Sequence, residues 1–295
     1  MKFSLKQIQI FQLVAELESV SEAAKRLHMS QSAASMALAQ LETQLGNELF
    51  LRQGRRMELT NWGVWLRPHA HALLENCATI EQGMKDMDLV SGELRIGCSQ
   101  TPAEHMLPHL IAELDHHFPR LKLRAEVENT EHVIEGLLDY RYDLGIIEGH
   151  CDNEDITRQT WCQDELVVIA GANHPYALQE RCSFAQLDMA QWILREHGAG
   201  TREIFDTHMH EHLEQIKVHR EYEQTNIILE LVAEGTYLSC LSKRLVQSWL
   251  DSGRIKKLNV PELTMKRDIS FIWRRQEAEN SNRSAIIKTA LKITD

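Results

Sequence analysis

The chain contains no long hydrophobic run. No stretch of its 295 residues approaches the roughly 20 consecutive apolar residues that a helix needs to cross a bilayer. Its first residues, MKFSLKQIQIF, include no apolar segment long enough for a secretory signal peptide. The sequence therefore predicts a cytoplasmic protein that has no membrane partner.

Cysteine is sparse, and its spacing forms no recognisable site. The six cysteines include no C-x-x-C motif and no set with histidine at metal-ligand spacing. Scattered thiols of this kind are typical of a reducing compartment.

Common catalytic motifs are also missing. The chain has no G-x-S-x-G, no H-E-x-x-H, no Walker loop and no G-x-G-x-x-G. His208, His210 and His212 recur at every second position, which on a helix points successive side chains of the series to different faces. The sequence therefore predicts that the protein is not an enzyme and holds no metal and no cofactor.

Positive charge is scarce over most of the chain, whose formal net charge is −11. Residues 1–65 carry seven Lys or Arg against six Asp or Glu, so the other 230 residues carry −12. A polyanion such as DNA is therefore tolerated only by the first segment, through a few placed cations.

The stretch from Ser19 to Gly46 has the pattern of two helices joined by a tight turn. Ser19 and Glu22 have the spacing of a capping box, and Ser30 can cap the second helix. Gly46 suits a left-handed helix end. The apolar positions of the second helix recur at helical spacing, at Ala34, Leu38, Leu41 and Leu45.

Short polar side chains stand at the start of that second helix. Gln31 can pair with adenine, and serine can bond to either base type or to phosphate. A helix-turn-helix presents this end to the major groove. The candidate DNA contacts are Ser30, Gln31, Ser32 and Ser35. The alternative is a helical hairpin with a polar face in water.

A β-hairpin with three arginines is expected next. Residues 49–51 and 57–59 have the pattern of two strands around a turn at residues 53–54. Arg52, Arg55 and Arg56 cluster on it, as in a wing whose arginines lie along phosphates or in the minor groove. The alternative is an exposed cationic turn that adds little to stability.

Residues 1–63 resemble the amino-terminal domain of LysR-type transcriptional regulators. The elements A-A-x-x-L, S-Q-S-A-x-S, L-E-x-x-L-G, L-F-x-R and L-T-x-x-G occur together and in register. The resemblance implies that Gln31, Ser32 and Ser35 touch the operator, with the three arginines on its backbone or minor groove. The chain departs from many members at Met36, where they carry a basic residue.

A long helix is predicted from Trp62 to about Leu89, and Pro68 should bend it or weaken one turn. This helix could dock on its own domain, but its heptad pattern of apolar residues favours pairing with the same helix of a second copy. The resemblance implies an antiparallel pair of linker helices, hence a dimer on a partly palindromic site. The heptad seam comprises Leu66, Ala70, Leu73, Cys77, Ile80, Met84 and Met87.

Beyond Ser91-Gly92 strands and helices alternate, which predicts an α/β class with a parallel sheet. One set is expected within residues 94–147, with a helix over 102–117, and a second begins with a strand at 166–170. A strand at 268–273 and the final helix are expected to rejoin the first set. The resemblance implies a bilobal, periplasmic-binding-protein-like effector domain with two parallel-rich subdomains joined by crossing strands.

Three segments are therefore expected: a winged helix-turn-helix over residues 1–61, a linker helix over 62–90 and an effector domain over 91–295. Within the effector domain, subdomain I covers about 91–163 and 268–295, and subdomain II covers about 164–267.

Ligands of open parallel sheets bind at the carboxyl ends of strands. There, Thr101 is expected to cap a helix that begins at Pro102, and backbone N–H groups at such helix starts can hold an anion. Capping alone is the alternative for this helix start. Arg195 and Arg202 could bind a carboxylate or an oxyanion, or they could instead pair with Glu148, Glu196 or Glu203. The candidate effector contacts are Ser99, Gln100, Thr101, Glu148, Arg195, Glu196, Thr201, Arg202 and Thr225.

The segments IIEGHC, DELVVIA and WILREHGAGTRE resemble the CysB/YeiE-like branch of the family. That resemblance implies a small oxyanion or sulfur compound as a candidate effector, and a link to sulfur metabolism. Where family members often carry Gly-x-Gly, this chain has Gly235-Thr236-Tyr237, so Tyr237 is expected to fill part of the cleft.

The sequence thus predicts a bacterial LysR-type regulator that binds double-stranded promoter DNA as a homodimer or homotetramer. It is an activator or a repressor, with RNA polymerase as a partner if it activates, and it responds to a small anionic effector. One alternative is a solute-binding protein of the same bilobal architecture, which the winged helix disfavours. Another is a thiol redox sensor at Cys98 or Cys240. For both cysteines, a role as a small buried hydrophobic residue is favoured over a redox role.

Overall fold

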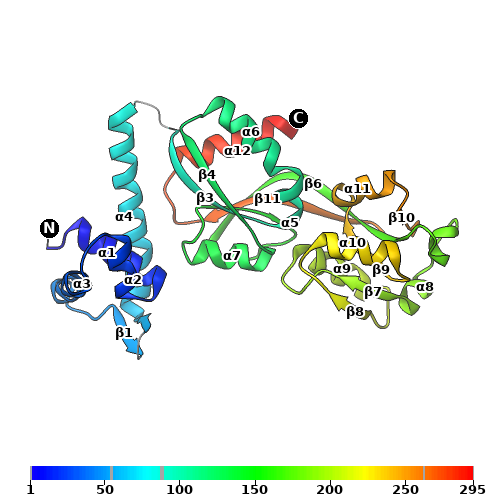
Figure 1. The fold of residues 1–295 in the computed structure, drawn as a ribbon, viewed down its shortest axis with the longest axis horizontal. Coiled ribbons are helices and arrows are strands. Elements are labelled where there is room, and N and C mark those ends of the chain that lie inside the picture. The colour runs from blue at the N-terminus through cyan, green and yellow to red at the C-terminus, as the bar shows by residue number, and fades with distance from the viewer. Residues whose placement is uncertain (1, 54–55, 87–89, 262, 295) are drawn as a thin grey trace. The chain divides into compact units, whose positions relative to one another are not determined.

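The computed structural model describes residues 2–53, 56–86, 90–261 and 263–294. These residues form two units, one within residues 1–89 and the other within residues 90–295 (Figure 1).

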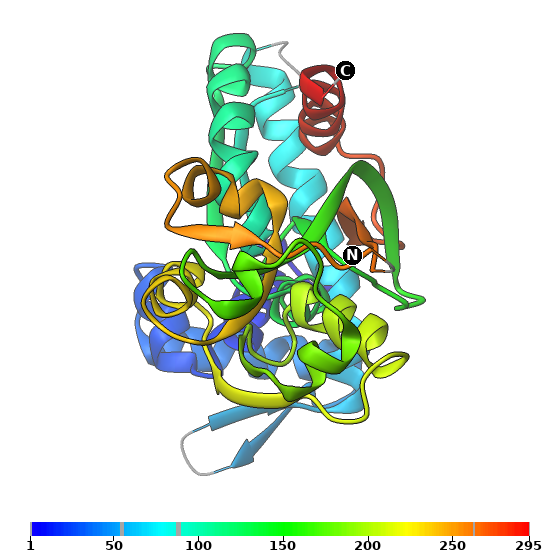
Figure 2. The same ribbon diagram turned by 90° about the vertical axis from the view of Figure 1, so that its right-hand side faces the viewer.

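The first unit is a helix-turn-helix with a wing and a long helix. Its core gathers side chains from every helix and from the hairpin, including Phe11, Ala24, Leu41, Phe50 and Leu66. The β1–β2 hairpin projects from the helices (Figure 2). The elements are α1 (Leu5–Leu17), α2 (Val20–Arg26), α3 (Gln31–Leu45), β1 (Phe50–Gln53), β2 (Arg56–Leu59) and α4 (Asn61–Asp86).

Local capping sets the ends of these helices. The hydroxyl of Ser19 accepts a hydrogen bond from the amide of Glu22, and Ser30 caps α3 in the same way. Gly46 ends α3 in the left-handed conformation, with φ of +81°. A capping box with both reciprocal bonds is formed at Ser4–Gln7, at the start of α1.

The helix α4 runs from Asn61 to Asp86 and continues through Pro68, which has no N–H to donate to the preceding turn. The first half of the predicted heptad seam packs on the core of its own unit, at Leu66, Ala70 and Leu73. Docking on its own domain, the alternative interpretation, therefore accounts for that half. Further along, Ile80 is 65% exposed.

The second unit is built on a mixed sheet flanked by helices. Its elements are β3 (Gly92–Cys98), α5 (Gln100–His105), α6 (Leu107–His117), β4 (Leu121–Val127), α7 (Thr130–Leu138), β5 (Leu144–Glu148), β6 (Ile156–Gly171), η1 (Pro175–Leu178), α8 (Phe184–Met189), β7 (Gln191–Leu194), α9 (Gly200–His210), β8 (Lys217–Glu221), α10 (Thr225–Glu234), β9 (Leu238–Ser242), α11 (Lys243–Asp251), β10 (Ile255–Lys257), β11 (Met265–Arg274) and α12 (Ser281–Thr294).

Two long antiparallel strands, β6 and β11, cross between two lobes (Figure 1). The strand order is β4-β3-β5-β11-β6-β9-β7-β8, with β10 beside β6. Within the lobes, β3 pairs in parallel with β4 and β5, and β7 pairs in parallel with β8 and β9. The crossing strands pair antiparallel with their neighbours, β11 with β5 and β6 with β9 and β10. We name residues 90–163 with 268–294 lobe I, and residues 164–267 lobe II.

Each lobe has its own hydrophobic core. In lobe I, Trp161 stacks on Phe271 with 4.9 Å between ring centroids, and its indole donates to the carbonyl of Ala290 in α12. In lobe II, Trp192 lies against Phe205 with 4.8 Å between centroids. The last strand and helix therefore return to lobe I, as the sequence predicts.

The helix expected over residues 102–117 is in fact two helices, which meet at Met106. Pro108 explains the break, because it cannot donate a hydrogen bond to the carbonyl of Glu104. The predicted cap is also wrong: α5 begins at Gln100 after Ser99, and Thr101 lies inside it. None of the helices among the described residues is long and apolar enough to span a bilayer.

Candidate functional site

The outward face of α3 is polar, exposed and uncharged. Gln31, Ser32 and Met36 are exposed, Met36 by 71%, while Ser35 is half-buried. The hydroxyl of Ser30 lies 3.1 Å from that of Ser32. Since α3 contains no Lys or Arg, any ionic contact to phosphate has to come from neighbouring elements of this unit.

Two cations in neighbouring elements form weak ion pairs with surface carboxylates. Lys25 lies 2.7 Å from Glu22, and Arg56 on β2 lies 3.9 Å from Glu18. Exposed ion pairs of this kind contribute about 0–1 kcal/mol, so a phosphate can replace the carboxylate at little cost. Arg52 belongs to β1, and Arg55 lies outside the described residues.

In the second unit, a buried guanidinium on β11 connects the two lobes. The side chain of Arg267 is fully buried. Its Nη2 donates to Oγ1 of Thr101 in lobe I at 2.9 Å, and its Nη1 donates to Oγ1 of Thr201 in lobe II at 2.7 Å. Its Nε donates to Oδ2 of Asp164 on β6 at 2.9 Å.

Glu148, at the end of β5, is the second charge of this cluster and is 1% exposed. Its carboxylate accepts from the amide of Thr101 at 3.2 Å and from the hydroxyl of Thr201 at 3.0 Å, and lies 3.3 Å from Nη1 of Arg267. Burial alone would raise the pKa of Glu148, but the charge of Arg267 and these hydrogen bonds hold that pKa below its ordinary value.

The backbones of the two lobes approach closely beside this cluster. A Cβ atom added to Gly200, at the start of α9, would lie 2.0 Å from the carbonyl oxygen of Glu148. The amide of Gly200 donates to Oγ1 of Thr130, which in turn donates to that same carbonyl. Glycine is therefore required at this position for the lobes to meet.

Two polar atoms near this junction are buried and unsatisfied. Arg195 is 3% exposed, and its Nε and Nη2 donate to Glu196 at 2.8 and 2.9 Å. Its Nη1, like Oγ of Ser99, is buried and has no hydrogen-bond partner among the described residues. A buried donor without a partner is costly, so Arg195 is suited to an added acceptor.

Arg202 is held entirely within lobe II. Its Nε donates to the carboxylate of Asp206, and its Nη1 donates to Glu221 on β8 and to the carbonyl of Arg195. From the sequence, Arg202 could bind an anion or form an ion pair with Glu148, Glu196 or Glu203. It forms ion pairs, but with Asp206, one helical turn along α9, and with Glu221 on β8.

A pocket of about 480 Å³ lies between α5 and the end of β4 on one side and Arg195-Glu196 and the start of α10 on the other. Gln100, Arg195 and Glu196 line it, and Thr225 donates to one of its carboxylates, Glu104. Arg202 instead lines a separate pocket of about 590 Å³ beside α7.

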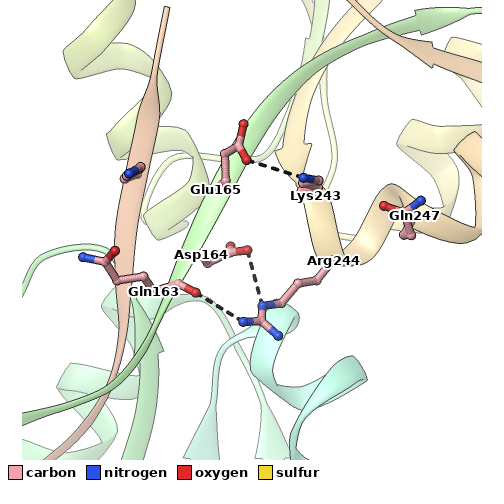
Figure 3. Close-up of a pocket in the computed structure, with 7 residues that line it drawn as sticks. Gln163, Asp164, Glu165, Lys243, Arg244 and Gln247 are labelled. Atoms are coloured by element: carbon pink, nitrogen blue, oxygen red, sulfur yellow. Dashed lines mark hydrogen bonds and ion pairs between the residues drawn. The ribbon is translucent and has the colours of Figure 1, made fainter. Parts of the chain in front are cut away.

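A third pocket, of about 410 Å³, lies at the surface where α11 begins (Figure 3). Arg244 donates to the carbonyl of Gln163, and its Nε lies 3.7 Å from Asp164. Asp164 therefore bridges this surface arginine and the buried Arg267.

Three sequence expectations can now be compared with these positions. Tyr237, expected in the cleft, stacks on His219 with 5.1 Å between ring centroids and is not among the residues that line the pocket beside Arg195. Burial raises the pKa of the Cys98 and Cys240 thiols, which favours the small hydrophobic role over the redox role. Among the described residues, no group of three His, Cys, Asp or Glu could hold a metal ion.

Arg267 and Asp164 are not among the residues predicted from the sequence. The prediction considered the carboxyl ends of parallel strands, whereas these two residues lie within antiparallel crossing strands. The only sequence signal was the pair of opposite charges themselves.

Comparison with known proteins gives consistent matches. The family model described as "LysR substrate binding domain" matches residues 88–292, and "Bacterial regulatory helix-turn-helix protein, lysR family" matches residues 5–64. The chain is 38% identical to the "Uncharacterized HTH-type transcriptional regulator YeiE" of Escherichia coli strain K12, over 94% of this chain and 93% of that protein.

Two solved structures share the fold along nearly the whole chain. A full-length OxyR variant from Pseudomonas aeruginosa has a TM-score of 0.77 at 21% identity and covers 98% of both chains. Full-length CbnR complexed with its target DNA has a TM-score of 0.62 at 22% identity, over 98% of this chain and 99% of that chain.

The close approach at Gly200 yields a first prediction. Gly200→Ala should force the start of α9 away from β5 and cost about 1–3 kcal/mol of stability. Hydrogen exchange should become faster at the amides of Gly200 and Thr201. Gly253→Ala, at a left-handed glycine with open space around it, is the control and should leave those amides protected. Unchanged exchange in Gly200→Ala would refute the requirement for glycine.

Proposed function

Because this chain belongs to the LysR family of bacterial transcriptional regulators, we propose that it regulates transcription by binding promoter DNA through α3 and the β1–β2 hairpin. Members of this family are DNA-binding regulators rather than enzymes. The observation that carries the proposal is the exposed end of α3, capped by Ser30 and carrying Gln31, Ser32 and Ser35.

The uncharged face of α3 suits base recognition by hydrogen bonds and apolar contact. Gln31 can make two hydrogen bonds to adenine, and the thioether of Met36 can lie against a thymine methyl group. Phosphate contacts then fall to the wing, through Arg52, Arg55 and Arg56, and to residues at the ends of the helices. The expected location is the cytoplasm, where promoter DNA is found.

A homodimer is the expected binding species. The far part of α4 carries Ile80 with its side chain largely exposed, which supports pairing with the same helix of a second copy. Two copies would place two α3 helices on a partly palindromic site. A homotetramer, and contact with RNA polymerase in the case of an activator, are compatible extensions of this arrangement.

The pocket beside Arg195 is the proposed effector site. The unsatisfied Nη1 of Arg195 supports a ligand with an anionic acceptor group, and Gln100 and Glu196 line the same pocket. Because Glu104, Glu128 and Glu223 also line it, such a group would have to lie at Arg195. Ser99, whose Oγ is also unsatisfied, and Thr225, which donates to Glu104, adjoin these lining residues. The resemblance to the CysB/YeiE-like branch favours an oxyanion or a sulfur compound. Such a ligand can shift DNA binding only if it binds two lobe arrangements with different affinity.

The base-reading role of α3 predicts a selective loss. Gln31→Ala should weaken binding to a duplex selected from a random-sequence pool by about 1–3 kcal/mol. Binding to an unrelated duplex should change less than about twofold, because phosphate contacts are retained. Gln9→Ala, at an exposed glutamine of α1, serves as the control. Equal losses on both duplexes in a titration at fixed salt would argue against base recognition.

The effector site predicts a specific dependence on Arg195. In a thermal-shift screen of sulfate, sulfite, thiosulfate and phosphate, at least one anion should stabilise the full chain. Arg195→Met should then weaken that anion's binding about 10- to 100-fold, the expected effect of losing a charge-assisted hydrogen bond.

Arg220→Met, at an exposed arginine of β8, removes the same charge and should leave the affinity unchanged. An anion that binds Arg195→Met as tightly as the original chain would place the effector elsewhere.

A further inference from the structure

The donors around Glu148 form the kind of set that holds an oxyanion. A backbone N–H from Thr101, a hydroxyl from Thr201 and the guanidinium of Arg267 all converge on one carboxylate. Charge-assisted bonds of this type bind carboxylates, sulfate and phosphate in proteins. Here the anionic group that these donors bind is the carboxylate of Glu148, a residue of the same chain.

The donors come from both lobes. Thr101 belongs to lobe I and Thr201 to lobe II, while Arg267 lies on the crossing strand β11. The carboxylate of Glu148 therefore bridges the lobes, as the anionic group of a bound ligand would at the base of a cleft. With 1% of the residue exposed, Glu148 is closed off from solvent in this arrangement of the lobes.

The buried cluster has no spare positive charge, because it holds two carboxylates and one guanidinium. Arg267 is countered by Glu148 and by Asp164, which also accepts from the hydroxyl of Ser242. An incoming anion at this position would face two buried carboxylates and one guanidinium. Buried like charges without added cations are strongly disfavoured, so such an anion would be repelled.

We infer that Glu148 acts as a resident anion, which fills the oxyanion position between the two lobes and excludes small external anions from it. The lobes then close at this point without a bound anion, and an effector's anionic group is left to Arg195. Glu148 is thus a specificity-determining residue, and removing its carboxylate opens a site for a small carboxylate. This inference rests on the proposed effector cleft and concerns a different position within it.

Chemical rescue tests the inference. Glu148→Ala should lower the melting temperature of the full chain by about 6 °C or more, because Thr101, Thr201 and Arg267 lose their acceptor. Sodium acetate should restore at least half of that loss, relative to sodium chloride at the same ionic strength. Acetamide, which has the same shape without the charge, should restore none of it.

Three further measurements make the result decisive. The original chain should gain less than about 1 °C from acetate in the same assay. Glu148→Gln fills the space without the charge, so it should lose stability and show no rescue. The experiment is repeated in an Arg195→Met background, so that an anion bound at Arg195 is not mistaken for rescue.

Several outcomes would overturn the inference. Acetate could stabilise the original chain as much as Glu148→Ala, or it could fail to stabilise Glu148→Ala at all. The Glu148→Gln variant could also be as stable as the original chain. If Glu148→Ala does not fold, its refolding yield with acetate against chloride replaces the melting temperature, and equal yields count against the inference. Failure of the effector screen at Arg195 would instead refute the proposed function and leave this result intact.

Discussion

The guanidinium of Arg267 lies fully buried at the point where β6 and β11 cross between the two lobes. Burying a charge is costly unless it is paired and hydrogen-bonded, and here Glu148, Asp164 and two threonine hydroxyls provide the partners. Because these partners come from α5, β5, β6 and α9, one buried charge ties the starts of two helices to two strands. The arrangement of the lobes depends on that constraint.

The same constraint relates the surface to the junction of the lobes. Opposite charges alternate from Arg244 at the surface, through Asp164 and Arg267, to Glu148 where the two lobes meet. A ligand that alters one member of this series changes the electrostatic balance of the next. The second unit is acidic and the helix-turn-helix unit is nearly neutral. The DNA contacts proposed for α3 would therefore be made by amide, hydroxyl and thioether groups rather than by cations.

Local features were predictable from the sequence, because each depends on a few neighbouring residues. The cap at Ser30 and the left-handed end at Gly46 lie where expected, and the alternation of strands and helices indicated the α/β lobes. The partners of Arg267 were not predictable, since Thr101 and Thr201 lie 166 and 66 residues away along the chain. Thr101 shows the difference, because its hydroxyl accepts from Arg267 instead of capping a helix.

Equilibrium unfolding of the Arg267→Met variant tests the central interaction most directly. Methionine retains an apolar stem of similar length but removes the buried guanidinium that pairs with both Glu148 and Asp164. The free energy of unfolding of the full chain, measured in urea by tryptophan fluorescence, should fall by about 3–5 kcal/mol. An unfolding midpoint equal to that of the original chain would contradict the claim that this guanidinium holds the lobes together.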